Sequence, residues 1–468
     1  MAQTQIGTDG IKNDAVTTAK IADNAVTAQQ IQSNTIQTGN IVGGAITTDR
    51  IANDAVNADK LANSINTAIA ANTAKDLTAL SASNLTSGTI PDARLPATLP
   101  AISGANLTNL PAGGKPTNLV LNGAMELAQR GTSSTVYGYG SVDRWRNTQS
   151  GITVTPTHSQ ETATSSDTGI WEAGFRKYLR WSLPSAGTNS AASWLSSTQF
   201  IEAQDVASSG WNYTSTSDYI TVSFWIRAST NQTFYANLGT RDGTRKRFSF
   251  AITASGNNTW TKITKTIPGH ADLQFDLNDD RGLDVQITVH YGTDYTGTAT
   301  LDAWVDNSGT NSYPDYATTW LTAGASTFDI TGVQLEIGNS ASDFAHESYN
   351  ETLRKCQRYY YVHAEGAWKS IGVGVMYQGS NMFTFIKLPV NMRNTPTLDQ
   401  TTGTNYYSAY LGASADEWTG FGGLWNATDT MVGLNVGTGQ GLSLGSDGQS
   451  AMVVTANAAA FLAFSAEL

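Results

Sequence analysis

Residues 11 to 65 read IKNDAVTTAK IADNAVTAQQ IQSNTIQTGN IVGGAITTDR IANDAVNADK LANSI, which is a repeat of ten residues. The first position of each repeat is Ile or Leu, and the sixth is Val or Ile. The fourth position of the full repeats is Asp, Asn or Gly, and the seventh is Thr, Gln or Asn. A fixed period of this kind is the signature of a repeat architecture. The repeat therefore decides how the N-terminal part of the chain is built.

The two aliphatic positions of a repeat are five residues apart, which fits neither a continuous helix nor a continuous strand. On a helix they would lie about 140° apart, and on a strand they would face opposite sides. Thr or Asn at the seventh position can N-cap a single helical turn. Asn, Asp or Gly at the third and fourth positions can end that turn in a left-handed conformation. Each repeat is therefore predicted to hold one short turn and one short extended piece.

So few apolar residues cannot bury a core within one chain, whereas three chains wound around a common axis can. Residues 1–66 are therefore predicted to form a short N-terminal end and a fibrous, trimeric stalk. The stalk core would consist of the aliphatic repeat positions Ile11, Val16, Ile21, Val26, Ile31, Ile36, Ile41, Ile46, Ile51, Val56 and Leu61. A disordered linker is the alternative, but it would not require so regular a placement of Ile and Val. A coiled coil is disfavoured because the 3.5-residue period is missing.

Residues 67–116 have a different composition. A short helix is predicted within 66–80, and the stretch SASNLTSGTIPDARLPATLPAISGANLTNLPAGGKP follows it. The five prolines of this stretch exclude a continuous helix and a central strand. Leu and Ile recur between the turns, which favours a continued intertwined shaft over an extended linker.

The aromatic density rises from Asn118 onward, and nine of the twelve tryptophans lie between Trp145 and Trp320. Short alternating segments separated by Gly, Asn, Asp and Ser are typical of antiparallel β-sandwiches. The chain is therefore predicted to be mostly β, with a jelly-roll-like sandwich over 117–346 and a second sandwich, the tip domain, over 347–468. Strands are expected at 219–228, 233–239, 246–253, 260–267, 283–292, 328–338, 370–379, 381–390, 428–437, 449–457 and 458–468. A short connecting helix is expected within 346–363.

The charge balance narrows the classes of partner. The net charge is -11 and the pI is near 4.9, which argues against nucleic acid and anionic membranes as partners. A glycan would have to be bound by short-range stacking and hydrogen bonds, or through a cation.

The lone Cys356 forms no intramolecular disulfide and is expected to be a small buried hydrophobe. We expect neither a signal peptide nor a membrane-spanning segment, and hence synthesis in the cytoplasm.

Catalytic motifs were sought, and none is convincing. His346-Glu347 is not followed by a second histidine at position 350, so the metalloprotease motif is absent. Asp279-Asp280 and Asp416-Glu417 are adjacent carboxylates, which point apart on a strand rather than facing one substrate. The protein is therefore predicted not to be an enzyme. No cofactor is expected. A structural Ca²⁺ is possible, because hard oxygen ligands are supplied by Asp272, Asp276, Asn278, Asp279, Asp280 and Asp284. The alternative is that these residues form an ordinary acidic loop.

Several stretches carry a family resemblance. NLVLNGAMELAQRGTSS with SVDRW (118–134 and 141–145) resembles the opening of a carbohydrate-binding-like β-sandwich that is frequent in phage tail-fibre and tail proteins. FDITGVQLEIGNSASDFAHESYNETLRKCQRYYYV (328–362) resembles the closing strand and exit of that domain, and VNMRNTPTL (390–398) resembles part of the domain that follows. AVTTAKIADNAVTA and GTIPDARLPATLPAISGANLTNLPA resemble phage fibre shafts.

The resemblance implies a homotrimeric bacteriophage tail fibre located in the virion. Its N-terminus would bind a phage tail or adaptor protein, and its C-terminal domains would bind a bacterial surface glycan such as lipopolysaccharide. A tailspike-like polysaccharide depolymerase is one alternative, and a purely structural fibre or collar element is another. The resemblance supplies no catalytic motif and no binding residues.

Candidate receptor-binding residues come instead from the loop-rich stretch TNYYSAYLGASADEWTGFGGLW (404–425) and its surroundings. Glycan sites need exposed aromatic faces and hydrogen-bonding groups, and binding residues are concentrated in loops. The candidates are Trp418, Tyr410, Trp425, Tyr406, Tyr407 and Trp368. For each of these aromatics, a place in the core or in the trimer interface is the alternative.

Overall fold

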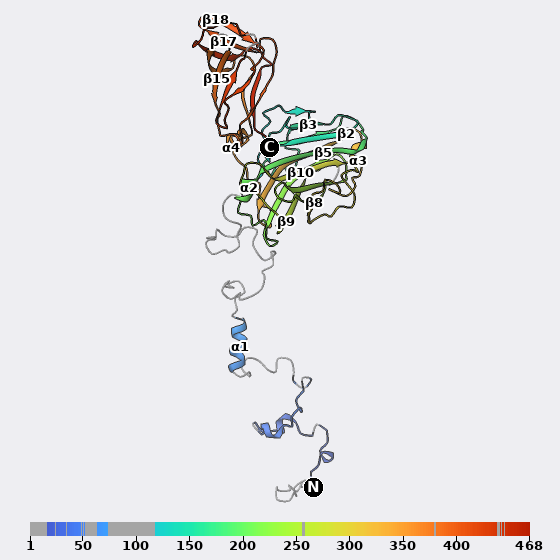
Figure 1. The fold of residues 1–468 in the computed structure, drawn as a ribbon. Helices are drawn as coiled ribbons and strands as arrows, with labels where there is room; N and C mark the ends of the chain where they lie inside the picture. The colour runs from blue at the N-terminus through green and yellow to red at the C-terminus, as the bar shows by residue number, and fades with distance from the viewer. Residues whose placement is uncertain are drawn as a thin grey trace, which may run out of the picture. The chain divides into compact units, whose positions relative to one another are not determined.

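The computed structural model describes residues 16–23, 25–33, 35–47, 49, 51, 63–73, 118–254, 258–378, 381–437, 440, 442–443 and 445–468 (Figure 1). The residues before Leu107 and those from Leu107 onward fall into two compact units. Ile11, Val56, Leu61 and the proline-rich stretch lie outside the described residues, so the predictions for them stay predictions.

The first unit repeats its backbone conformation with the period of the sequence. Single 3-10 turns occur at η2 (Thr18–Lys20), η3 (Ala28–Gln30) and η4 (Thr38–Asn40). Thr27 and Gln37, both at the seventh repeat position, are the N-caps of η3 and η4, and Ile31 and Ile41 that follow these turns are extended. The predicted turn that begins at the seventh repeat position is confirmed, and so is the extended residue that follows it.

One detail of that prediction is wrong. Residues at the third and fourth positions do not end the 3-10 turn, because the three repeats that the structure describes between 21 and 47 contain a second, separate turn. It is closed by hydrogen bonds from Ala25 N to Ala22 O, from Thr35 N to Gln32 O and from Ala45 N to Val42 O. Asn, Asp and Gly suit that second turn, and Gly44 adopts a left-handed φ of 81° there. The apolar positions therefore have a tight turn on either side.

The aliphatic repeat positions are exposed in the single chain. The exposed fractions of Val16, Ile21, Val26, Ile31, Ile36, Ile41, Ile46 and Ile51 range from 41% to 58%. A single helix, α1 (Asn63–Thr73), completes the described part of this unit and begins three residues before the predicted helix.

The sandwich consists of two six-stranded antiparallel sheets packed face to face (Figure 1). The first has the order β1-β3-β4-β12-β6-β9 and contains β1 (Ser133–Ser134), β3 (Thr157–Thr162), β4 (Lys177–Ser182), β12 (Thr327–Ile337), β6 (Tyr219–Ala228) and β9 (Thr261–Pro268). The second has the order β11-β8-β7-β10-β5-β2 and contains β11 (Trp304–Asp306), β8 (Lys246–Thr253), β7 (Thr233–Thr240), β10 (Arg281–Tyr291), β5 (Asn189–Glu202) and β2 (Arg146–Ile152). Two short helices, α2 (Ala203–Ala207) and α3 (Thr319–Thr322), lie in the connections.

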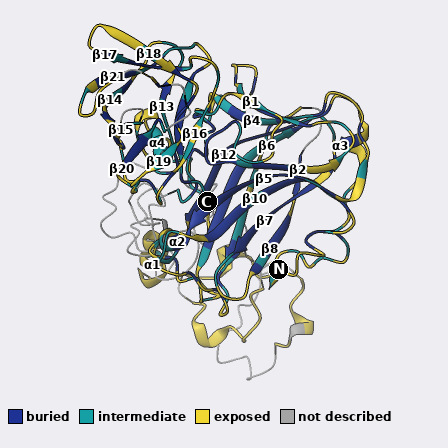
Figure 2. Cartoon of the chain, turned by 45° about the horizontal axis from the view of Figure 1, so that its top comes forward, coloured by how far each residue is buried: buried dark blue, intermediate teal, exposed yellow. Residues whose placement is uncertain are grey.

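Alternating apolar side chains fill the space between these sheets. Val222, Phe224 and Ile226 of β6 and Val285 and Ile287 of β10 belong to one buried cluster. Figure 2 shows the strands β5, β7 and β10 largely in the colour of buried residues. The predicted strands over 219–268, 283–292 and 328–338 match β6 to β10 and β12 within a few residues, so the alternation of the sequence identified this core correctly.

The tip domain has a seven-stranded sheet and a three-stranded sheet. The larger has the order β18-β17-β21-β14-β15-β20-β19 and contains β18 (Ser414–Trp418), β17 (Tyr407–Leu411), β21 (Ser450–Thr455), β14 (Ser370–Tyr377), β15 (Asn381–Lys387), β20 (Met431–Asn435) and β19 (Gly423–Trp425). The smaller has the order β13-β22-β16 and contains β13 (Tyr360–Glu365), β22 (Phe461–Ser465) and β16 (Thr397–Gln400). The expected connecting helix is α4 (Tyr349–Gln357), capped by Ser348, and it is followed directly by β13.

The fold class is therefore as predicted: mostly β, with antiparallel sheets in both C-terminal domains. Cys356 is fully buried in α4, as expected of a small hydrophobe. No helix in the described part of the chain is long and apolar enough to cross a membrane.

Candidate functional site

The outer face of the sheet that contains β10 and β5 carries polar side chains. Leu283, Val285 and Ile287 of β10 point into the core, so Asp284 and Gln286 between them point away from it. In the antiparallel register Gln286 pairs with Thr198 of β5 and with Asn237 of β7. Polar residues from β5, β7 and β10 are thereby brought together on this outer face, and we call them the floor.

This floor is recessed into a cleft with a volume of about 270 Å³. The cleft is lined by Tyr137, Arg146, Thr148, Trp194, Thr198, Phe200, Arg241, Asp284, Gln286, Tyr291 and Tyr295. These residues are up to 158 positions apart in sequence (137 to 295), so the register of the sheet and the flanking loops assemble the site.

Aromatic side chains form the walls of the cleft. Trp194 and Tyr295 meet edge to face with ring centroids 5.8 Å apart, and Tyr291 lies 5.5 Å from Tyr295. On the other side the exposed Tyr137 accepts a hydrogen bond of 2.6 Å from Nη2 of Arg146, whose guanidinium also lies 4.8 Å from the centroid of the same ring. On each side of the cleft, an aromatic ring is therefore held in place by a neighbouring side chain.

A hydrogen-bond network fixes the amide of Gln286. Its Oε1 accepts from Asn237 Nδ2 at 2.9 Å, and its Nε2 donates to Ser196 Oγ at 3.1 Å and to the Tyr291 hydroxyl at 2.9 Å. Burial raises the pKa of Tyr291, so its hydroxyl stays protonated at neutral pH and can donate to a ligand. The polar groups of the floor are thus held in a single arrangement.

Asp284 is the most unusual group of the floor, since it is only 3% exposed. Its Oδ2 forms an ion pair with Arg241 Nη2, but its Oδ1 has no hydrogen-bond partner among the residues that the structure describes. Burial raises the pKa of this carboxyl group, and the adjacent Arg241 opposes the effect. A Cβ on the cross-strand Gly239 would lie 2.3 Å from Oδ1, so the carboxylate requires glycine at that position. A buried acceptor without a partner is costly unless a ligand or water completes it.

The cleft therefore offers aromatic faces, fixed amide and hydroxyl groups and, in its floor, a buried carboxylate with one oxygen that has no hydrogen-bond partner among the described residues. This combination suits a polyhydroxylated ligand, whose rings stack on aromatic side chains while its hydroxyls exchange hydrogen bonds with the floor. Among the described residues that line the cleft, Asp284 is the single carboxylate. Glycoside hydrolysis uses a pair of them.

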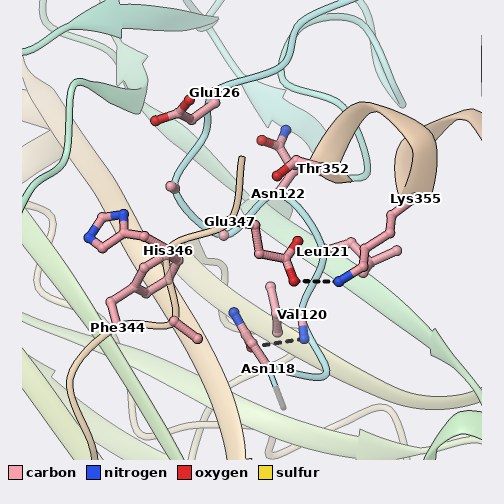
Figure 3. Close-up of a pocket in the computed structure, with 13 residues that line it drawn as sticks. Asn118, Val120, Leu121, Asn122, Glu126, Phe344, His346, Glu347, Thr352 and Lys355 are labelled. Carbon is pink, nitrogen blue, oxygen red and sulfur yellow. Dashed lines mark hydrogen bonds and ion pairs between the residues drawn. The ribbon is translucent and has the colours of Figure 1, made fainter. Parts of the chain in front are cut away.

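Two other hollows of the sandwich were compared with the cleft. The niche in Figure 3 lies where residues 118–126 enter the domain and residues 344–355 leave it, and Glu347 and Lys355 form an ion pair across it. Its volume of about 30 Å³ suits a single water molecule rather than a ligand.

The other hollow lies on the opposite sheet and has a volume of about 400 Å³. Trp225, Phe175 and Phe344 line it, and its His346 ring is already bonded to Ala173 O at 2.8 Å. Among the described residues that line it, no buried side-chain polar atom lacks a partner, so we favour the cleft.

The structure divides the receptor-binding candidates of the tip domain into two groups. Trp418 and Tyr407 are 1% and 0% exposed, and they pack together with Phe421 in the core of the domain. Tyr406 is half-buried at the edge of that core.

The remaining candidates are accessible. Trp425 is 44% exposed, Tyr410 is half-buried on β17, and Trp368 is 65% exposed in the turn after β13. Trp425 and Tyr410 belong to one sheet, whereas Trp368 precedes it.

The six oxygen-bearing residues from Asp272 to Asp284 do not assemble as a calcium site. Asp272 forms an ion pair of 2.9 Å with Lys246, while Asp284 faces the cleft floor and Arg241. Among the described residues, no group of three or more His, Cys, Asp or Glu side chains could hold a metal ion. The ordinary acidic loop is the interpretation that fits.

Trp194, Tyr291, Tyr295 and Gln286 were not predicted from the sequence as site residues. The polar residues alternate along LDVQITVHYG, but outward polar residues are usual on any sandwich strand. A recessed outer face leaves no distinct signal in a single strand, because loops from elsewhere in the chain create the depth.

The chain was compared with known proteins. No family model matches it, and no curated protein matches it in sequence. A solved structure that aligns with it is the enzymatically active domain of tailspike protein 4 of bacteriophage CBA120, with 12% identity, a TM-score of 0.26, and coverage of 47% of this chain and 21% of that one. The chain thus spans about a fifth of the length of that tailspike domain.

Carbohydrate-binding modules also align. The CBM22-1 xylan-binding domain of Paenibacillus barcinonensis Xyn10C matches at 10% identity and a TM-score of 0.24, covering 49% of this chain and 100% of its own. The tandem CBM22-1-CBM22-2 domain of the same protein matches at 8% identity and a TM-score of 0.23, covering 77% of this chain and 100% of its own. With TM-scores this low, these similarities assign neither a family nor an activity to this chain.

Proposed function

We propose that this protein is the subunit of a homotrimeric bacteriophage tail fibre that binds a bacterial surface glycan without cleaving it. The observation that carries the binding role is the cleft of the sandwich, which Trp194 and Tyr295 line together with the buried, incompletely paired carboxylate of Asp284. The sandwich, rather than the tip domain, is the proposed sugar site.

The chemistry of the cleft supports this role. Pyranose rings expose C–H faces that stack on aromatic rings, and their hydroxyls need donors and acceptors placed at fixed positions. The cleft supplies Trp194, Tyr291 and Tyr295 for stacking and Asp284, Gln286 and Arg146 for hydrogen bonding. Because only one of these groups is a carboxylate, binding is supported over hydrolysis.

The fibre part of the proposal rests on the shaft. The aliphatic side chains of the repeat recur every five residues and are 41% to 58% exposed in the single chain. Apolar side chains that recur so regularly need a partner surface, and two further copies of the same repeat provide one. The resemblance of residues 118–145, 328–362 and 390–398 to phage fibre segments supports the same assignment, with the N-terminus attached to the virion. Three sites per fibre would strengthen weak individual contacts.

The test uses the full chain and envelope polysaccharides extracted from a panel of bacterial strains. Retention of the protein on the immobilised polysaccharide and the chain length of the polysaccharide are followed together. We expect binding with unchanged chain length, and loss of binding in Trp194→Ala. Trp225→Ala is the matched control, because this half-buried tryptophan lines the hollow on the opposite sheet.

The other outcomes are equally informative. A fall in polysaccharide chain length would establish a depolymerase in place of the proposed adhesin. Loss of binding in Trp225→Ala but not in Trp194→Ala would move the site to the opposite sheet. Absence of binding across the panel would favour a structural fibre element.

A further inference from the structure

The outer face of the seven-stranded sheet in the tip domain is apolar and uncovered. The inner face packs on the three-stranded sheet through one buried cluster that includes Ile371, Met382 and Phe464. The outer side chains are large and exposed by 42% to 64%: Val373, Val375, Tyr377, Phe385, Trp425, Met431 and Met452. We call this set, together with Tyr410 and Phe383, the outer tip face.

The strand register places these side chains next to one another. Met452 of β21 is paired with Tyr410 of β17 on one side and with Val373 of β14 on the other. Directly paired residues of antiparallel strands point to the same face. Phe385 is likewise paired with Gly433, which is paired with Trp425, so an apolar strip crosses β15, β20 and β19.

The aromatic residues of the outer tip face form a contiguous group. Trp425 lies 4.9 Å from Phe383 and 6.1 Å from Phe385, and Tyr377 lies 5.9 Å from Phe383, measured between ring centroids. A contiguous apolar surface of this kind is rare on a monomer and marks an interaction site.

The composition of the face distinguishes between partners. Among its outward positions, the described charged residues are Lys387 at the end of β15 and Glu417 on the edge strand β18. Within the outer tip face itself, two valines, two methionines and two phenylalanines stand against three side chains that can form hydrogen bonds, Tyr377, Tyr410 and Trp425, whereas a glycan site requires more polar groups. Aromatic residues and methionine with few charges are typical of the centre of a protein–protein interface.

We propose that the outer tip face is buried against the outer tip faces of other copies of this chain. The chain has a net charge of -11, so copies repel one another except through uncharged surfaces, and this face is such a surface. Because the faces of all copies are equally apolar, they can bury one another without a different protein as partner. The proposal rests on the trimer proposed above and extends it to a second surface, because joined shafts would hold three tips at high effective concentration.

One consequence concerns the receptor-binding candidates. Trp425 and Tyr410 both belong to the outer tip face, so the proposal assigns them to contact between copies rather than to a ligand. Trp368, which is 65% exposed and lies outside this sheet, would stay accessible to a ligand.

The test is the rate at which a maleimide labels a cysteine placed on the face of the full chain. Cys356 is fully buried and gives little background. Met452→Cys introduces a thiol at a side chain that is 63% exposed in the single chain, and Leu277→Cys, at a site that is 80% exposed in the sandwich, is the control. The interface centre excludes solvent, so we expect labelling at position 452 to be at least about tenfold slower than at 277. Adding Phe385→Glu should restore fast labelling, because a charge would then lie in the contact.

The mass of the particle, measured by light scattering, separates the possible failures. Fast labelling at position 452 in a particle of three chains would overturn the contact between tips and leave the shaft trimer intact. Fast labelling in a particle of one 49.7 kDa chain would overturn both proposals. Fast labelling that slows when polysaccharide is added would identify the face as a receptor surface and overturn the contact between copies.

Discussion

Arg358 and Glu202 form a two-pronged ion pair that joins the tip domain to the sandwich. Nε and Nη2 of Arg358 donate to the two carboxylate oxygens of Glu202, each at 2.7 Å. The Tyr359 hydroxyl donates to Oε1 at 2.5 Å, and Gln204 Nε2 donates to Oε2 at 2.6 Å. Glu202 is fully buried at the end of β5, so its charge depends on these donors. Burial acts to raise the pKa of Glu202, but the hydrogen bonds from Arg358 and Tyr359 outweigh it and hold the pKa below its ordinary value.

Replacing Glu202 by Gln should destabilise the protein. Gln offers one acceptor oxygen where Glu202 offers two, so some of the donors around it lose their partner, while Arg358 is 33% exposed and can be partly solvated. We therefore expect the free energy of unfolding to fall by about 2 kcal/mol in urea denaturation. Glu351→Gln is the control, because its pair with Arg354 is solvent-exposed and should contribute less than about 0.5 kcal/mol. Equal effects of the two substitutions would contradict a role for Glu202 in joining the domains.

The stability of the sandwich should depend on pH through His290. This ring is 2% exposed and contacts Ser193 Oγ at 3.1 Å, and burial lowers its pKa from 6.5 to about 4. As the pH falls below 6.5, His290 binds a proton in the unfolded chain, whereas in the folded chain it stays neutral until about pH 4. Stability is therefore lost across this window, by up to about 3 kcal/mol from this group.

The measurement compares wild type with His290→Gln in urea at several pH values. The stability of the wild type relative to the variant should decrease as the pH falls from 7 to 4. His270→Gln, at an exposed histidine, is the control for the loss of a histidine in general. A difference between wild type and His290→Gln that does not change with pH would show that the His290 ring does not carry the dependence.

Asp284→Asn should separate ligand binding from stability. The pKa of Asp284 is raised by burial, so its ionised form is disfavoured in the folded protein. Removing that charge should leave the melting temperature unchanged or higher, since Arg241 is 27% exposed and can be solvated. Affinity for the retained polysaccharide should fall about tenfold, the cost of a hydrogen bond to a charged group. Asp294→Asn, on the exposed loop after β10, is the control, and a loss of stability without a loss of affinity would contradict the role of the carboxylate.

The shaft proposal predicts that polar residues at the first repeat position prevent assembly. Ile31→Asn with Ile41→Asn removes two aliphatic side chains that are 42% and 43% exposed in the single chain. We expect the mass in light scattering to fall from that of three chains toward 49.7 kDa. The paired change Gln29→Asn with Gln32→Asn, at exposed polar positions of two neighbouring repeats, should leave the mass unchanged.

Local patterns of the sequence predicted most of the elements. The alternation in YITVSFWIRA and KRFSFAIT gives the bounds of β6 and β8, and the short helix expected within 346–363 is α4. The turn at the seventh repeat position was also predicted, since capping depends on residues three positions apart.

The candidate site could not be predicted in the same way. Asp284, Arg146 and Trp194 lie on three strands, and their proximity depends on pairing between distant segments. Trp418 illustrates the converse. Its stretch resembles an exposed loop, but position 418 ends β18 opposite Tyr407 and points inward. A one-residue difference in register decides which aromatics are accessible.

The shaft owes a further property to its turns. Their hydrogen bonds close over three residues, from Thr17 to Lys20 and from Ala22 to Ala25 and so on through Val42 to Ala45. The backbone hydrogen bonds of these turns therefore do not depend on more distant repeats, and excising ten residues would leave the order of the turns unchanged. In the proposed trimer, excising five residues would place a 3-10 turn of one chain beside the other type of turn in its neighbours. The proposed fibre could thus be lengthened or shortened in whole decapeptides without redesign of either end.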